Sequence, residues 1–303
     1  MIDQSTAREN LHGIILMVLS MACFALEDVF IKTAAAEVPG SQVLLLIGLP
    51  GMLIFMAWAR WQGEPVVSKA LFTLPVMIRN FGEVIGTAAI VQAFILLPLS
   101  TSMAIFQATP LVVTLGAALF LGAQVGWRRW SAIAVGFFGV LLIIRPGMEG
   151  FDPATIFPVI TTLALAARDL ATRWIPSDVS SAQLSTYGFG SVAVAGLVLL
   201  PFGGPLIWPG ATNMTIMGGA LAFGVIGYYW LTAANRVGEV AVVTPFRYTR
   251  LLFALILGAL VFAERPDVLT LTGAALILAS GLYTLMREAH ARSRPLSTGK
   301  TPG

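Results

Sequence analysis

The chain has 303 residues, of which 57% are hydrophobic and only 11% are charged, and its mean hydropathy is +0.86. Since a soluble domain carries about 25% charged residues, this composition excludes a soluble globular protein of the same length. The net charge of +3 comes from basic residues scattered over short segments without a basic stripe, which argues against a nucleic-acid-binding face.

The first apolar stretch, residues 11–36, is too long for a signal-peptide core and has no A-x-A-like site after it, so a retained transmembrane helix is expected. It contains Cys23, the single cysteine, which excludes an internal disulfide or a multi-cysteine metal site. Runs of about 20 apolar residues cross a bilayer as helices, and loops with Pro, Gly or charge separate ten such runs. The predicted spans lie near residues 12–34, 41–60, 72–96, 100–122, 128–145, 154–174, 181–201, 213–236, 240–262 and 267–287.

Basic residues near the span ends predict the orientation, because Lys and Arg favour cytoplasmic loops. Eleven of them fall on the loops that include both termini, and three, Lys32, Arg145 and Arg265, fall on the opposite side. Both termini are therefore predicted to be cytoplasmic, in the inner (plasma) membrane of a bacterium. The arginines that remain inside the spans are Arg79, Arg168, Arg247 and Arg250.

The second half of the chain repeats the first. FQATPLVVTLGAALFLGAQ at 106–124 aligns with FRYTRLLFALILGALVFAE at 246–264, and EDVFIK at 27–32 aligns with RDLATR at 168–173. Chance similarity between apolar helices is the alternative, but the charged matches disfavour it. Each half holds five spans, and because five is odd, the second copy must be inverted in the membrane. The predicted segments are a cytoplasmic N-terminus (1–11), a first repeat (12–145), a second, inverted repeat (154–287) and a cytoplasmic basic tail (288–303).

Each half also closes on a similar pattern. The first ends with TPLVVTLGAALFLGAQ, a Trp-Arg-Arg-Trp turn and GFFGVLLIIRPG; the second ends with GALVFAERPDVLTLTGAALILASGLY. With these motifs and the five-plus-five layout, residues 10–288 resemble the EamA branch of the drug/metabolite transporter superfamily, most closely the YddG-type exporters of aromatic amino acids. The chain departs from the family where Gly-Glu is usual, with Ala123-Gln124 and Ala263-Glu264, and where Pro is usual in the ninth span, with Arg250.

The resemblance implies an all-α membrane protein of ten transmembrane helices, arranged as two inverted five-helix repeats around a central cavity. Spans one to four of each half would surround the cavity, and spans five and ten would lie at the periphery. It also implies a secondary transporter that exports small metabolites by alternating access, foremost amino acids including aromatic ones. A broad-specificity drug or metabolite efflux protein and a solute channel are the alternative functions.

No catalytic, cofactor or metal site is expected. His12 and His290 are the only histidines, and H-E-x-x-H, G-x-S-x-G and glycine-rich phosphate motifs are missing from the sequence. Transport is therefore expected to proceed without ATP, with a small molecule and the lipid bilayer as partners and a monomer as the simplest state. Proton-coupled and facilitated transport are both compatible with the sequence.

Polar groups within spans predict the substrate site, since lipid cannot solvate them and they turn to a cavity or to a partner. Arg79 and Glu83 are four residues apart and are expected to pair, with Asn80 on the same face. Arg247 has no acidic residue near it in its span and can hold a carboxylate. Structural ion pairs and snorkelling are the alternatives. The predicted substrate-binding residues are Arg79, Asn80, Glu83, Phe106, Gln107, Tyr228, Tyr229, Trp230, Arg247 and Tyr248.

The aromatic members of this set lie near mid-span and can stack on a planar ligand. At most two of Tyr228, Tyr229 and Trp230 can share a helix face, because successive residues are about 100° apart. Ordinary helix packing is the alternative interpretation of these side chains.

The stretch FALEDVFIK in the first span predicts gating residues. Asp28 and Lys32, like their repeat mates Asp169 and Arg173, are four apart with the acid first, so Asp28 and Asp169 can either pair locally or reach across a closing cavity. A helix-end salt bridge without a gating role is the alternative. Glu27 aligns with Arg168, and a pair between them is predicted. The predicted gating residues are Glu27, Asp28, Lys32, Arg168, Asp169 and Arg173.

Overall fold

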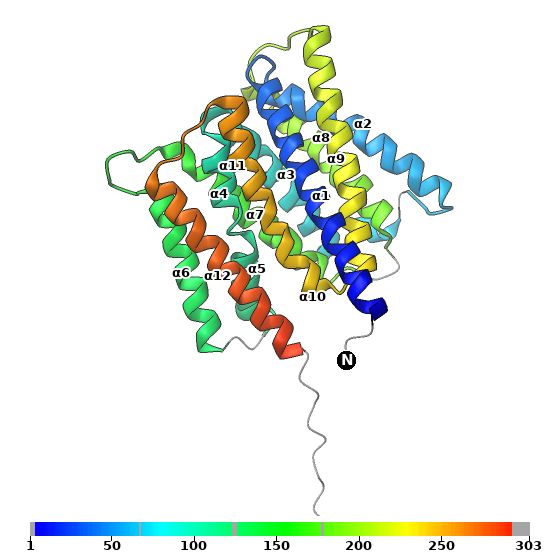
Figure 1. Ribbon diagram of the computed structural model, residues 1–303. Coiled ribbons are helices and arrows are strands. Elements are labelled where there is room, and N and C mark those ends of the chain that lie inside the picture. The colour runs from blue at the N-terminus through cyan, green and yellow to red at the C-terminus, as the bar shows by residue number, and fades with distance from the viewer. Residues whose placement is uncertain (1–3, 67, 123–125, 177–178, 293–303) are drawn as a thin grey trace, which may run out of the picture.

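The computed structural model describes residues 4–66, 68–122, 126–176 and 179–292, and within these ranges it is helical without strands (Figure 1). Ten helical segments are long and apolar enough to cross a membrane, which confirms the prediction of ten spans. The elements are α1 (Gln4–Ala35), α2 (Gly40–Trp61), η1 (Lys69–Phe72), α3 (Leu74–Leu96), α4 (Leu99–Phe106), α5 (Thr109–Phe120), α6 (Trp127–Ile144), η2 (Pro153–Thr155), α7 (Ile156–Thr172), α8 (Ser181–Leu199), η3 (Leu200–Phe202), α9 (Ala211–Val237), α10 (Val240–Val243), η4 (Thr244–Tyr248), α11 (Thr249–Phe262) and α12 (Val268–Arg292).

The helices begin and end where the local chemistry requires it. Pro39 and Pro98 precede α2 and α4 in extended conformations, as expected for a residue that fixes φ and lacks an N–H. Ser180 and Gln183 form a capping box at the start of α8, in which each side chain accepts from the other residue's backbone N–H.

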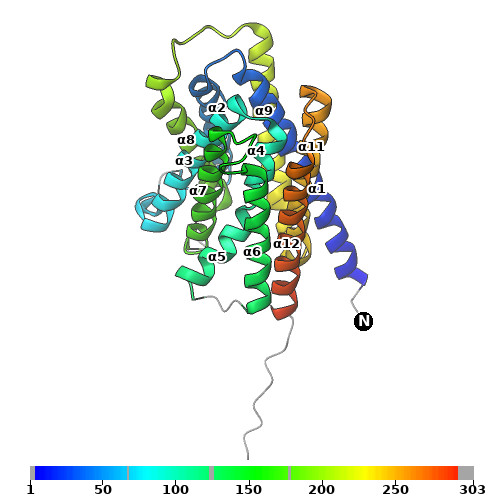
Figure 2. The same cartoon turned by 90° about the vertical axis from the view of Figure 1, so that its left-hand side faces the viewer.

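The main contacts between helices are symmetric, in that they are preserved when the two halves are exchanged. The most extensive contacts join α1 to α9, α3 to α7, α2 to α8 and α6 to α12. Exchanging the repeats turns the α1–α9 contact into the α7–α3 contact and leaves the other two in place. The pair α6 and α12, spans five and ten, lies side by side at one edge of the bundle (Figures 1 and 2).

The α6–α12 pair packs closely because glycines face each other. A Cβ added to Gly139 would lie 2.7 Å from the carbonyl oxygen of Gly273, and one added to Gly273 would lie 2.5 Å from the carbonyl oxygen of Gly139. Small residues allow this kind of backbone approach between membrane helices. The C-terminal end of α12 lies on the same side of the bundle as the start of α1, at the bottom of Figure 1.

Spans four and nine are interrupted, whereas the sequence predicted continuous helices over 100–122 and 240–262. Pro110 has no N–H to donate to the carbonyl of Phe106, and the hydroxyl of Thr109 donates to that oxygen instead (2.6 Å). The repeat mate of Thr109 does the same: Thr249 donates to the carbonyl of Phe246 (2.7 Å) after the 3₁₀ turn η4. The two breaks therefore lie at equivalent positions of the two halves.

The two breaks also touch. Gln107 is 6% exposed, and its side-chain amide donates to the backbone carbonyl of its own repeat mate, Arg247 (3.3 Å). A contact between equivalent residues lies on the axis that relates the halves. This contact therefore marks the centre of the bundle, around which the charged side chains of the next section are arranged.

Candidate functional site

All four arginines inside the spans gather in one region with four carboxylates. Electrostatic interactions join Arg247 to Asp169, Arg168 and Arg250, Glu27 to Asp28, Arg250 and Glu83, and Arg79 to Glu83, Arg168 and Asp169. We call this group the charged cluster: Glu27, Asp28, Arg79, Glu83, Arg168, Asp169, Arg247 and Arg250. It draws on α1, α3, α7, η4 and α11, and its formal charge sums to zero.

One ion pair of the cluster joins α1 to α11. Arg250 donates from Nη2 to both oxygens of Asp28 (2.8 and 2.9 Å) and from Nε to Oδ2 (3.1 Å). Asp28 is 4% exposed, and the guanidinium carbon lies 5.2 and 5.5 Å from the ring centroids of Phe24 and Phe106. Of the two arrangements that the sequence allowed for Asp28, the local pair with Lys32 is not formed, and the carboxylate reaches across to another helix. A bidentate, charge-assisted partner on another helix neutralises Asp28 instead.

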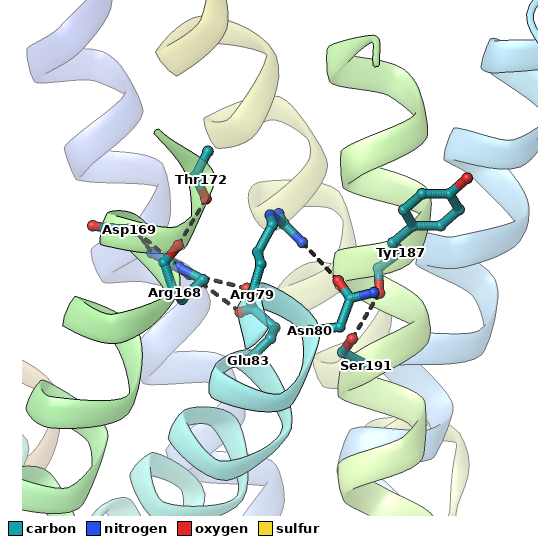
Figure 3. A network of polar contacts seen from close by, with 8 residues as sticks. All are labelled: Arg79, Asn80, Glu83, Arg168, Asp169, Thr172, Tyr187 and Ser191. Atoms are coloured by element: carbon teal, nitrogen blue, oxygen red, sulfur yellow. Dashed lines mark hydrogen bonds and ion pairs between the residues drawn. The ribbon is translucent and has the colours of Figure 1, made fainter. Parts of the chain in front are cut away.

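A second group of ion pairs joins α3 to α7 (Figure 3). Arg168 Nη1 donates to both oxygens of Glu83 (3.2 and 3.1 Å), and its Nε donates to Asp169 (2.9 Å). Gly82 brings the helices together, because a Cβ there would lie 2.7 Å from the carbonyl oxygen of Ala164. The close approach makes Arg168 the cation nearest to Glu83.

These contacts correct three further predictions. The predicted pairs were Arg79 with Glu83, Asp169 with Arg173, and Glu27 with Arg168; the structure forms none of them. The first two predictions used helix spacing alone, and partners on a facing helix take precedence in the folded chain. Arg173 is exposed, and no ion pair holds it in the described ranges.

Arg79 is a buried cation without a carboxylate partner among the described residues. It is 8% exposed, and its Nη1 donates to the side-chain oxygen of Asn80 (3.1 Å). In Figure 3 its side chain points away from the Arg168–Glu83 pair, and its guanidinium lies 3.5 Å from the position of a Cβ on Gly188 of α8. Arg79 thus lies at the contact between α3 and α8.

Arg247 is the second cation without a carboxylate partner among the described residues. It belongs to the break in span nine, its residue is exposed although the break lies at the centre of the bundle, and its side chain forms no ion pair within the described ranges. Glu27 is the corresponding anion: it has no hydrogen bond or ion pair in the part of the chain that the structure describes, and it lies against Gly224 of α9. Two cations and one anion of the cluster are therefore unpaired.

The aromatic candidates divide between the cluster and the surface. Tyr228 packs edge-to-face on Phe55 (5.4 Å between centroids) and lies near enough to Arg79 to interact with it electrostatically. Phe55 also stacks on Phe189 (5.3 Å). Tyr229 is 55% exposed and faces Trp58 instead. Sequence reasoning missed the α2 and α8 rings, because nothing in their own helices marks them as neighbours of Tyr228.

Two other predicted residues pack mainly against helices outside the cluster. Trp230 is partly buried, and it makes no aromatic pair within the described ranges. Tyr248 is 4% exposed, and its hydroxyl packs against Gly281 of α12 without a hydrogen-bond partner. Tyr248 therefore packs on α12 and reaches the cluster only through an electrostatic interaction with its neighbour Arg247, as far as the described residues show. Phe106 and Gln107 are brought to the cluster, through Arg250 and Arg247 respectively.

Two charged residues, Lys32 and Glu264, connect neighbouring helices on the side of the bundle opposite the start of α1. Lys32 donates to the carbonyls of Phe94 (2.8 Å) and Leu97 (2.6 Å) at the end of α3. Glu264 accepts from the backbone N–H groups of Leu99 (2.6 Å) and Ser100 (2.9 Å) and so caps α4. The sequence marked Glu264 only as part of a motif, since a cap supplied from 165 residues away leaves no local signal.

Comparisons with known proteins extend over both halves. The family model of the EamA-like transporter family matches residues 11–145 and again residues 153–286. A riboflavin transporter of Rhizobium johnstonii is 28% identical over 218 residues, which cover 70% of each chain. An S-adenosylmethionine uptake transporter of Rickettsia felis is 22% identical over 94% of this chain and 96% of that one.

A further relative and a solved structure are also similar to most of the chain. A pseudopaline exporter of Pseudomonas aeruginosa is 26% identical over 88% of this chain and 93% of its own length. A solved crystal structure with 18% sequence identity superposes with a TM-score of 0.60 and covers 95% of this chain and 99% of the other. At that identity the superposition describes the fold alone.

Proposed function

Since this chain belongs to the EamA-like transporter family, and is therefore a membrane transporter, we propose that it exports small amino-acid-like metabolites, including aromatic ones, by binding them in the charged cluster and alternating access to it. The observation that carries the proposal is the pair of unpaired cations, Arg79 and Arg247, beside ion pairs that are already complete. A charge at membrane depth is costly without a partner. A substrate carboxylate is a partner that both guanidinium groups can hold.

Charge balance within the cluster supports this assignment. Asp28 neutralises Arg250, and Glu83 with Asp169 surrounds Arg168. These side chains would have to break an existing ion pair before they could bind a charged ligand. Arg79 and Arg247 would not, so they are the groups we assign to the substrate carboxylate.

The rings near Arg79 support a substrate with a flat aromatic part. Tyr228 and Phe55 form an edge-to-face pair, and Phe55 stacks on Phe189. Aromatic side chains of this kind stabilise planar ligands by stacking. The similar proteins named for riboflavin and S-adenosylmethionine carry molecules with flat rings, and S-adenosylmethionine also has the ammonium and carboxylate groups of an amino acid.

The proposal is tested with the purified full-length chain in liposomes. We expect saturable uptake of at least one aromatic or neutral amino acid from a radiolabelled panel, measured with and without a pH gradient. No saturable uptake of any member under either condition would refute the proposal. Flux that rises linearly with concentration would favour the alternative of a solute channel, and a gradient-dependent rate would show proton coupling.

Variants assign the carboxylate site. We expect Arg79→Gln and Arg247→Gln each to raise the KM about tenfold or more, since hydrogen bonds to charged groups contribute about 1.5–3 kcal/mol. Arg236→Gln is the matched control, because Arg236 is exposed near the end of α9 and lies outside the cluster. An unchanged KM in both cluster variants would place the substrate elsewhere.

The topology that accompanies this function is also a proposal. We infer from the distribution of Lys and Arg that both termini are cytoplasmic and that the membrane is the inner one. Reporter fusions after residues 303 and 150 are expected to place the first in the cytoplasm and the second on the opposite side. The reverse result would also reverse the proposed direction of each half of the transport cycle.

A further inference from the structure

The two halves differ in charge at one pair of equivalent helix contacts. By the offset of 141, Glu27 of α1 is the mate of Arg168, and Gly224 of α9 is the mate of Glu83. The α7–α3 contact therefore brings Arg168 onto Glu83, and the equivalent α1–α9 contact brings Glu27 onto a glycine. One of these two equivalent contacts therefore contains a complete ion pair, and the other contains only the anion, Glu27.

The glycine shapes this half-site. A Cβ on Gly224 would lie 2.5 Å from Oε1, 3.0 Å from Cδ and 3.4 Å from Oε2 of Glu27. The whole carboxylate group thus lies against the α9 backbone, in space that any other residue would occupy. Within the described ranges no donor of the protein reaches it.

The charges near Glu27 are engaged elsewhere. The groups that act on it are Asp28, Arg250 and Glu83. Asp28 and Arg250 hold each other at 2.8 Å, and Glu83 holds Arg168 at 3.1 Å. Two of these three neighbours are anions, so the surroundings of Glu27 favour a cation that comes from outside the protein.

We propose that Glu27 binds a cationic group of the substrate, the ammonium of an amino acid, and so makes the transporter select zwitterions over simple carboxylates. This inference rests on the proposed function, in which Arg79 and Arg247 hold the carboxylate. Glu27 then supplies the opposite pole of the site, and Gly224 supplies the room. Binding of the substrate ammonium would then supply the partner that a carboxylate at membrane depth requires.

The test compares two probes that differ in the ammonium group alone. Uptake of radiolabelled phenylalanine into liposomes containing the full-length protein is competed with 3-phenylpropionate, which has the same ring and carboxylate. We expect the native protein to prefer phenylalanine by about tenfold or more, as a charge-assisted hydrogen bond in a dry site implies. Glu27→Gln should bring the two inhibition constants to within about threefold of each other.

Two further variants separate binding from folding. Gly224→Ala keeps every charge and pushes the carboxylate from its place, so it should weaken phenylalanine and leave 3-phenylpropionate unchanged. Glu27→Asp should keep the preference at a lower rate. Glu149→Gln, in an exposed loop, is the control. If Glu27→Gln gives no flux, the same two constants are measured as ligand-induced shifts in the melting temperature of the purified protein.

The outcomes are distinct from those of the proposed function. Absence of all saturable uptake by the native protein refutes the function itself. Uptake without a preference for phenylalanine, or a preference that survives Glu27→Gln, overturns the role of Glu27 and leaves the transporter assignment standing. A preference lost in Glu27→Gln and weakened in Gly224→Ala supports it.

Discussion

Two carboxylates at equivalent depths of the two halves, Asp28 and Asp169, have different partners. Asp28 is buried and reaches across to Arg250, 222 residues away. Asp169 has a side chain that is 32% exposed and bonds to Arg168, its immediate neighbour. The mate of Arg250 is Pro110, so the partner that Asp28 uses does not exist in the other half. Equivalent backbones thus carry unequal charges, which is what a site that binds an asymmetric molecule requires.

Breaking the buried pair is expected to have the largest effect. Asp28→Asn leaves Arg250 without a counterion, and removing one partner of a buried ion pair costs about 3–5 kcal/mol of folding stability. We expect a strongly reduced melting temperature and little transport. Asp169→Asn is the matched change in the other half and should cost much less. Equal losses in the two variants would show that the difference in burial has no energetic consequence.

The Arg168–Glu83 pair is expected to be less critical for folding, because Arg168 keeps Asp169 when Glu83 is changed. Glu83→Gln should cost about 1–3 kcal/mol, the range for hydrogen bonds to charged groups. Transport per folded molecule should fall more than expression, since the substitution leaves an additional positive charge beside Arg79. Flux per folded molecule that stays at the native level would exclude Glu83 from the site.

Lys32 and its mate Arg173 give a smaller contrast. Lys32 donates to two carbonyls at the end of α3, and Arg173 is exposed without an ion pair in the described ranges. Lys32→Met should lower stability by about 1–2 kcal/mol through the lost bonds. Arg173→Met should stay within about 0.5 kcal/mol, as surface substitutions do. Thermal unfolding of both variants in detergent measures the difference, and a larger loss for Arg173→Met would contradict it.

The smallest effect is expected at the loop before α12. The Arg145 guanidinium, followed by the backbone N–H of Thr270, lowers the pKa of Asp267 from its ordinary value of 3.8 to about 2. A lowered carboxyl pKa adds stability above about pH 4, and this stability is lost as the pH falls towards 2. The melting temperatures of the native protein and Asp267→Asn should therefore differ slightly at pH 5 and converge near pH 2. Because Asp267 is largely exposed, the effect should be under about 1 kcal/mol, and a gap that widens on acidification would contradict it.

The sequence predicted the spans and the layout well, because both depend on local hydropathy and on similarity between the halves. It predicted which charged residues lie inside the spans and missed their partners. Asp28 and Glu83 bond to residues 222 and 85 positions away, and helix spacing can suggest only neighbours three or four residues distant. The one useful signal was the lack of acidic residues near Arg247 and Arg250 in their span, which left another helix, a substrate carboxylate or water as possible partners.

The breaks and the unpaired groups show the same limit. Continuous spans were predicted across both breaks, although a proline lies at each of them, Pro110 in span four and Pro245 in span nine. Tyr248 lies between two arginines of the cluster in sequence, and its hydroxyl packs against Gly281 of α12. That Arg79, Arg247 and Glu27 remain unpaired is a property of the whole packed bundle, and no single helix contains it.

The contact of Gln107 with the carbonyl of Arg247 has a mechanical consequence. Each of the two interrupted spans consists of two short helical segments that meet at a break. The side-chain amide of Gln107 links one break to the other. We expect the helical segments of the two spans to tilt together, so that opening on one face of the membrane is coupled to closing on the other. Under the proposed alternating access, loss of this one hydrogen bond is expected to let the two breaks move independently and to raise the leak of substrate across the membrane.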